Sequence, residues 1–210
     1  MALDLAGMDH AGRWIEAAQP EHPSLIDQAH VMDELFGVVN VPNGIWIDEE
    51  GVIVRPPEPA FPGRSMFADM QIPGDMDQYL ADVLREAKKI RHQPDKYVGA
   101  LRDWVERGSE SRYALTPAQV VERSQPRPAA AALAAAHFEM AQHLHRLGHR
   151  ADAVPHFREA HRLAPENWTY KRQAWSMAHP FQGPSEDYES DWLSDVRKIG
   201  AENYYPPLDM

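Results

Sequence analysis

The spacing of apolar residues changes along this chain, and it predicts strands near the start and helices afterwards. Short apolar runs separated by turn residues predict a strand at Ala2–Leu5 and a short helix over residues 12–18. Ser24 is then expected to be the N-cap of a helix that runs to Phe36 and is ended by Gly37. The buried face expected for this helix follows the helical spacing and consists of Leu25, Ala29, Met32, Leu35 and Phe36.

The clearest strand signal is a pair of β-rich runs joined by an acidic turn. Residues 38–48 and 52–55 flank the turn sequence Asp-Glu-Glu-Gly at 48–51, which predicts an antiparallel hairpin. Trp46 alternates with its two isoleucine neighbours, so its side chain is expected on the opposite sheet face from theirs. The stretch 56–63 carries four prolines and is expected to be an extended loop.

From residue 75 onwards the pattern is helical. Helices are expected at 75–87, at Pro94–Arg107 and at residues 117–123, the last with Thr116 as its N-cap and proline at its first position. Residues 124–128 have the composition of a linker.

The last third of the chain has the spacing of a helical hairpin. Gly148 is expected to make the turn between two antiparallel helices, and Pro165 to close the second. The small and aromatic residues that pack such helices are Ala141, Ala153, Phe157 and Ala160. This pattern resembles a tetratricopeptide repeat (TPR), with His137 where that family has a large aromatic residue. Because one repeat cannot bury its own faces, a further helix at 168–177 is expected to pack on it.

Four short motifs follow one another in the first third of the chain. They are Glu34-Leu35-Phe36-Gly37-Val38, Asn40-Val41-Pro42, Ile45-Trp46-Ile47-Asp48 and Gly51-Val52-Ile53. Together they resemble the later part of a thioredoxin-like domain of the peroxiredoxin and thiol-disulfide (ResA and TlpA) type, and the whole chain is similar to a bacterial ResA-like group. In that family the proline before the third strand is cis and faces the active site, and Pro42 holds that position. The resemblance also implies that Ala2–Asp4 is the strand before the central helix.

The fold class expected from these patterns is α/β plus all-α, with a partial thioredoxin-like sheet followed by a helical TPR-like region. Three regions are expected along the chain: a partial thioredoxin-like unit at 1–61, a helical connector at 62–128 and the TPR-like helical region at 129–210.

The absence of cysteine decides which functions the resemblance can imply. It removes disulfides, thiolate metal sites and the family's dithiol chemistry. Two hypotheses remain. The first is a thioredoxin-like binding or scaffold module whose TPR-like region contacts a peptide or another subunit. The second is the truncated body of a thiol or selenocysteine disulfide oxidoreductase whose reactive residues lie upstream of Met1. Because a missing strand and helix would expose a sheet edge and an apolar face, we also expect a homodimer.

Six of the 11 histidines lie between His137 and His161, which raises the question of a metal site. His145 and His149 are four residues apart, so a helix would place them on one face, where they would bind Zn or Ni. No H-E-x-x-H signature accompanies the pair, so a polar helix face is the preferred interpretation and no cofactor is expected.

A second polar group, Asp27, His30 and Glu34, also recurs at helical spacing. It is either an acid–base pair near Pro42 or the solvated face of an amphipathic helix, and the solvated face is the preferred interpretation.

Charge and composition narrow the partners further. Lys and Arg total 21 against 32 Asp and Glu, a formal net charge of −11, which argues against a nucleic-acid or anionic membrane partner. No apolar run approaches the ~20 residues of a membrane helix and no signal peptide is visible, so the cytoplasm is the expected location. The P-loop, G-x-G-x-x-G and G-x-S-x-G motifs are absent.

Overall fold

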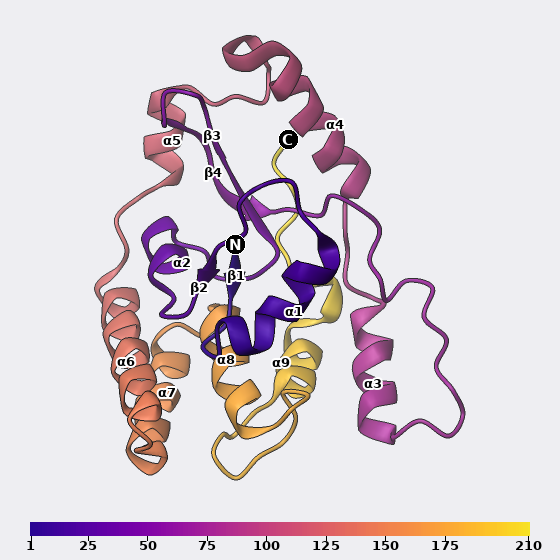
Figure 1. Cartoon of the computed structure of the whole chain (residues 1–210), viewed down its shortest axis with the longest axis vertical. Helices are drawn as coiled ribbons and strands as arrows, with labels where there is room; N and C mark the ends of the chain where they lie inside the picture. Colours follow the sequence, from indigo (N-terminus) through magenta and orange to yellow (C-terminus); the bar gives the residue numbers. More distant parts are fainter. The chain divides into compact units, whose positions relative to one another are not determined.

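The computed structural model describes all 210 residues (Figure 1). They form two compact units, each made from two separate stretches of chain. The first unit comprises residues 1–39 and 127–177, and the second comprises residues 40–126 and 178–210. Each unit contains one two-stranded sheet, so the chain is a mixed α/β protein with many helices. The expected single partial sheet is therefore replaced by two separate sheets.

The first unit combines a short parallel strand pair with five helices. Its elements are β1 (Ala2–Leu3), α1 (Met8–Ala18), β2 (Ile26–Asp27), α2 (Val31–Phe36), α6 (Ala129–Arg146), α7 (Arg150–Leu163) and α8 (Trp168–Ala178). β1 and β2 are parallel, with Ala2 opposite Ile26 and Leu3 opposite Asp27. The N–H groups of Trp168 and Thr169 both donate to the carbonyl of Val39, at 2.7 and 3.3 Å. These bonds join the start of α8 to the early part of the chain.

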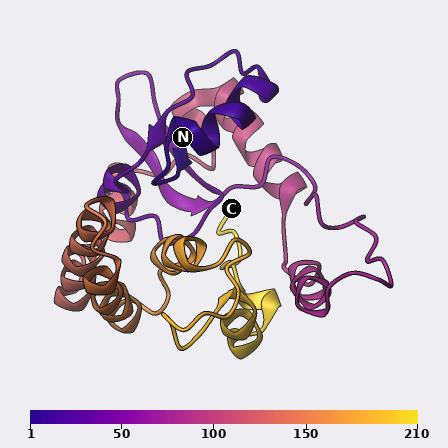
Figure 2. The same ribbon diagram turned by 60° about the horizontal axis from the view of Figure 1, so that its bottom comes forward.

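The predicted helical hairpin is confirmed. α6 and α7 lie side by side as antiparallel neighbours in both views (Figures 1 and 2), and Gly148 turns between them with a φ of +83°. Ala141, Ala153 and Ala160 are all buried where the two helices meet, because residues without long side chains let the backbones approach. α8 supplies the further helix expected after Pro165.

The second unit holds an antiparallel hairpin and shorter helices. Its elements are β3 (Asn43–Ile47), β4 (Ile53–Pro59), α3 (Gln78–Ala87), α4 (Pro94–Arg107), the 3₁₀ turn η1 (Gly108–Glu110), α5 (Pro117–Arg123), α9 (Trp192–Ile199) and the 3₁₀ turn η2 (Ala201–Asn203). Thr116 caps α5 as predicted, in a capping box with Gln119. The hairpin is confirmed, but β4 runs on to Pro59 where a loop was expected. In a two-stranded sheet every strand is an edge strand, so prolines without an N–H are tolerated there.

The core of the second unit gathers around Trp46, which is 2% exposed. Its ring stacks on Trp104 of α4, with centroids 5.0 Å apart, and meets Tyr97 edge to face. Gly44 on the same strand packs so closely against Tyr97 that an added Cβ would lie 2.5 Å from its hydroxyl oxygen. Leu208, from the non-helical tail of the chain, completes the cluster. Helix α4 and the tail therefore cover this face of the hairpin.

The predicted helix over residues 24–36 is wrong in its first half. Only α2 is helical there, and β2 precedes it. The N–H of Ala2 donates to the carbonyl of Leu25 at 2.8 Å, so strand pairing takes up backbone groups that a helix would have used. The pairing partner lies more than twenty residues earlier, so the local spacing of apolar residues does not reveal it.

Candidate binding surface at helix α2

Helix α2 exposes its apolar side chains and buries a charged one, which is the reverse of the usual amphipathic helix. Its apolar side chains Val31, Met32 and Leu35 are exposed, Val31 to 53% and Leu35 to 72%. Its one fully buried side chain is Asp33, which is 1% exposed. The buried face predicted from the spacing of Leu25, Met32 and Leu35 is therefore the outer face.

The turn before α2 is built on two polar residues that the sequence analysis assigned to a solvated face. That assignment is wrong, because Asp27 and His30 are both buried. The Asp27 carboxylate accepts from the N–H groups of Val31 at 3.0 Å and Met32 at 2.6 Å, which satisfies the free donors of the first turn. His30 has a φ of +57°, and this left-handed backbone turns the chain from β2 into the helix.

His30 sits in a polar network inside the first unit. Its Nδ1 lies 2.9 Å from Oδ2 of Asp33, and its Nε2 lies 3.2 Å from Oε1 of Gln173 on α8. The ring meets Phe138 of α6 edge to face, with centroids 5.1 Å apart. Both ring nitrogens thus face oxygen acceptors, an arrangement that suits the doubly protonated imidazolium.

The electrostatics of this network favour a charged His30. Burial lowers the pKa of His30, but the hydrogen bond to Asp33, the charges of Asp33 and Asp27 and the hydrogen bond to Gln173 outweigh it. The net result is a pKa above the ordinary value of 6.5. His30 is therefore held in a buried ion pair with Asp33, and its side chain is only 3% exposed to a substrate.

The network is not fully satisfied. Oδ1 of Asp33 and Oε1 of Gln142 are buried without a hydrogen-bond partner, although Nε2 of Gln142 donates to the carbonyl of Ala29 at 3.4 Å. Burying such atoms costs on the order of 1–3 kcal/mol each. The inward polar side of α2 is therefore retained at a cost in stability.

Glu34 anchors α2 from its flank. The hydroxyl of Tyr170 on α8 donates to the Glu34 carboxylate, and the Arg127 guanidinium forms an ion pair with it. Burial, with a contribution from the Asp33 charge, raises the pKa of Tyr170 to about 12, so the phenol stays a donor. Helices α6 and α8 thus hold the inner side of α2 while its apolar side faces outward.

The Val41–Pro42 peptide bond is cis, as the thioredoxin-like resemblance implied. The carbonyl of Val41 accepts from the Tyr205 hydroxyl at 2.6 Å. The N–H of Val41 donates to Oδ1 of Asn40 at 2.9 Å. Asn40 in turn donates to the carbonyl of Tyr204 at 3.2 Å. The contacts around Pro42 are thus hydrogen bonds that tie the C-terminal tail to the hairpin.

The histidine pair singled out from sequence does not share a helix face. α6 ends at Arg146, just after His145, and His149 precedes the first residue of α7. The structure instead brings together His137 and His156, one from each helix, with their Nδ1 atoms 2.9 Å apart. No group of three or more His, Asp or Glu side chains is arranged to hold a metal ion.

Sequence reasoning missed three residues of the α2 network, namely Asp33, Gln142 and Gln173. A usable signal was present in the polar residues Asp27, His30 and Asp33, each three positions apart. Nothing in the sequence marks the two glutamines, because their role depends on how α6 and α8 pack.

Comparison with protein-family models, with curated proteins and with solved structures found no match for this chain. No helix is both long enough and apolar enough to cross a membrane.

Proposed function

We propose that this chain is a protein-binding module that docks a basic, amphipathic segment of a partner protein on the outer face of α2. In this proposal the thioredoxin-like unit has no redox role, since the chain has no cysteine. The helical, TPR-like region supports the docking face from behind.

The observation that carries the proposal is the inverted polarity of α2. A helix that exposes Leu35 and buries Asp33 forgoes apolar burial and also desolvates a charge, and both effects oppose folding. Exposed apolar side chains grouped on one element typically mark an interaction surface. The outward face continues into its neighbours, because Leu25 and Val39 on either side of the helix are exposed as well.

The chemistry of the partner follows from charge. Residues 1–39 carry seven acidic residues and a single arginine. Of the acidic residues, Asp9, Glu16 and Glu21 are exposed. A segment with leucine-like side chains on one face and lysines or arginines on the other complements such a surface. A second copy of this chain would bring like charge against like charge, so we favour a basic partner over the homodimer expected from sequence.

The test uses the full-length chain and a synthetic amphipathic helix of leucine and lysine as the probe, with a leucine–glutamate peptide of the same pattern as its counterpart. We expect the lysine peptide to bind and the glutamate peptide not to bind, measured by isothermal titration calorimetry. Leu35→Ser should weaken binding of the lysine peptide about tenfold. Val105→Ser is the matched control, because Val105 is equally exposed, at 73%, but lies on α4 of the second unit.

Three results would overturn the proposal. Equal binding of the two peptides would show that charge does not select the partner. An equal loss on Leu35→Ser and Val105→Ser would show that α2 is not the docking face. Self-association in analytical ultracentrifugation that Leu35→Ser abolishes would assign the face to a second copy of this chain.

A further inference from the structure

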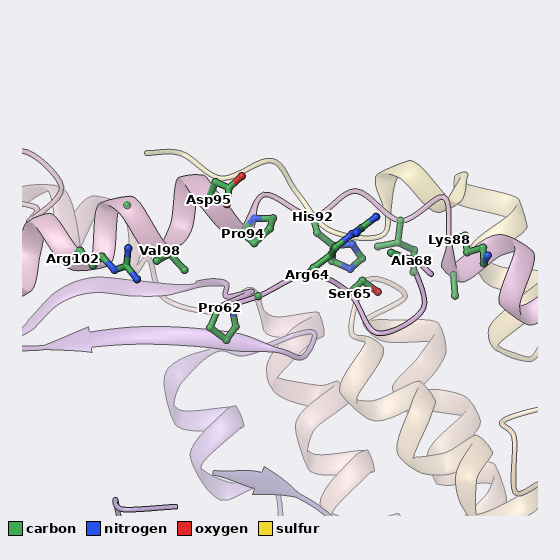
Figure 3. A pocket seen from close by; sticks show the side chains of 14 residues that line it. Pro62, Arg64, Ser65, Ala68, Lys88, His92, Pro94, Asp95, Val98 and Arg102 are labelled. Atoms are coloured by element: carbon green, nitrogen blue, oxygen red, sulfur yellow. The ribbon is translucent and has the colours of Figure 1, made fainter. Parts of the chain in front are cut away.

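The second unit contains a cavity of about 850 Å³ between the loop after β4, the end of α3 and the first turns of α4 (Figure 3). Proline, glycine and alanine residues form much of its wall, among them Pro62, Gly63 and Ala68. Its volume lies within the range of small-molecule binding sites. It shares no residue with the α2 surface, so a ligand bound in this cavity is independent of the proposed docking of a partner protein.

The charged side chains that line this cavity are predominantly cationic. Arg64 comes from the loop, Lys88 from the end of α3 and Arg102 from α4, whereas Asp95 is the one acidic residue in the lining. Lys88 and Arg102 form no ion pair within the chain, and Arg64 pairs only with the exposed Asp69, at 3.1 Å. In a chain with a net charge of −11, three cations around one cavity with a single acid are a local reversal of charge.

The cations are spread along the cavity rather than gathered at one point. Figure 3 shows Arg102 toward one end and Lys88 toward the other, with Arg64 and His92 between them. Such a row suits a ligand with several anionic groups along its length, since a single anion would reach only part of it.

His92 is held in place beside this row. Phe61 meets its ring edge to face with centroids 4.3 Å apart, and Tyr205 packs on the same aromatic group. Burial lowers the pKa of His92, so its ring is neutral near pH 7 and can donate one N–H to an anion. In the first turn of α4, Pro94 has no N–H and the N-cap residue Gln93 makes no side-chain cap, so the backbone N–H groups of Asp95 and Lys96 are the donors left.

We propose that this cavity binds a small molecule that carries two or more phosphate groups. Arginine guanidinium groups and free N–H donors at a helix start both match the geometry of phosphate oxygens. Arg64, Lys88 and Arg102 hold the phosphates, and His92 contributes a hydrogen bond from the cavity wall. The Asp95 carboxylate repels an anionic ligand. Removing its charge should therefore strengthen binding, whereas removing a cationic side chain should weaken it.

The experiment titrates the full-length chain with inorganic tripolyphosphate, pyrophosphate and monophosphate by calorimetry at low ionic strength. We expect affinity to fall in that order. Arg102→Gln should weaken tripolyphosphate binding about fivefold. Asp95→Asn should strengthen it by a similar factor. Arg107→Gln is the matched control, because it removes the same charge from the same helix outside the cavity and should leave the affinity unchanged.

Hexaglutamate provides the comparison between phosphate and carboxylate ligands. Binding of hexaglutamate as tight as that of tripolyphosphate would overturn the assignment to phosphate. Equal effects of Arg102→Gln and Arg107→Gln would show that net charge alone governs binding and would overturn the site. An unchanged chemical shift of the His92 ring protons in a saturating tripolyphosphate titration would place the ligand elsewhere.

Discussion

The two units each bury a charged side chain, but they treat it differently. In the second unit the Arg55 guanidinium bonds to the Glu58 carboxylate through Nε and Nη2, at 2.6 and 3.2 Å, and to the carbonyls of Tyr113 and Asp209. It also lies over the Trp46 ring, 5.5 Å from its centroid. In the first unit, Oδ2 of the buried Asp33 carboxylate is hydrogen-bonded to His30, whereas Oδ1 has no hydrogen-bond partner.

The Arg55–Glu58 pair therefore stabilises the fold, whereas the His30–Asp33 pair determines which side of α2 faces outward. All three nitrogens of Arg55 are hydrogen-bonded, and Nη2 ties the hairpin to the C-terminal tail through the Asp209 carbonyl, as a buried charge must be satisfied if the fold is to benefit. The His30–Asp33 pair is less well satisfied, and its position forces the apolar side of α2 outward. The second unit therefore packs aromatic rings around a fully bonded buried charge, while the first retains a less favourable core beneath its candidate binding surface.

The largest expected effect is on the aromatic core of the second unit. Trp46→Ala should lower the free energy of unfolding by about 4 kcal/mol, because the lost ring packs on Trp104 and Tyr97 and the cavity collapses only in part. Urea denaturation followed by circular dichroism measures this change. Ile47→Ala on the same strand is the control, with about 1 kcal/mol expected because Ile47 is partly exposed. Comparable losses from both variants would contradict the central place of Trp46.

The next largest effect is a loss of stability on substitution in the polar core of the first unit. Asp33→Ala should cost about 3 kcal/mol, because it leaves His30 buried without its partner. In a double-mutant cycle with His30→Ala, the double variant should cost at least 1 kcal/mol less than the sum of the two single variants. The cycle also cancels the strain of an alanine at the positive φ of residue 30. Additive losses would mean that the two side chains are not coupled. That result would contradict the conclusion that the first unit holds a buried His30–Asp33 ion pair.

The smallest effect is a pH dependence carried by His30. Its pKa in the folded chain lies above the unfolded value, so its contribution to stability is fully present below about pH 6.5 and is lost as the pH rises through the folded pKa. The carboxylates that face it are Asp33 and Asp27, and Gln173 is its neutral neighbour. The difference in unfolding free energy between the native chain and His30→Ala, measured from pH 5 to 9 in roughly unit steps, should therefore narrow as the pH rises. A constant difference across this range would rule out the charged form of His30.

Local sequence signals were sufficient for elements whose partners are close in the chain. The hairpin of β3 and β4 follows from two β-rich runs and an acidic turn, in which the Asp48 carboxylate accepts from the N–H groups of Glu50 and Val52. The hairpin of α6 and α7 follows from its alanines and Gly148. In both cases the residues that pair lie within one short stretch, so the pattern contains both halves of the contact.

Sequence reasoning failed where a distant segment decides the structure. Residues around β2 follow a helical spacing, but parallel pairing with β1 makes them a strand. Leu208 of the C-terminal tail enters the core, and the Leu208 carbonyl accepts from the Lys96 ammonium at 2.6 Å. None of these contacts is encoded in the local period of apolar residues.

The sequence by itself determined the absence of thiol chemistry, the acidic character of residues 1–39 and the existence of both hairpins. Each of these depends on composition or on neighbours along the chain. Only the tertiary structure decided that Asp33 points inward and Leu35 outward, and that Arg64, Lys88 and Arg102 surround one cavity. The physical reason is that burial is a property of the packed chain. A side chain's spacing fixes which neighbours share its face, whereas segments far away in the sequence decide which face is covered.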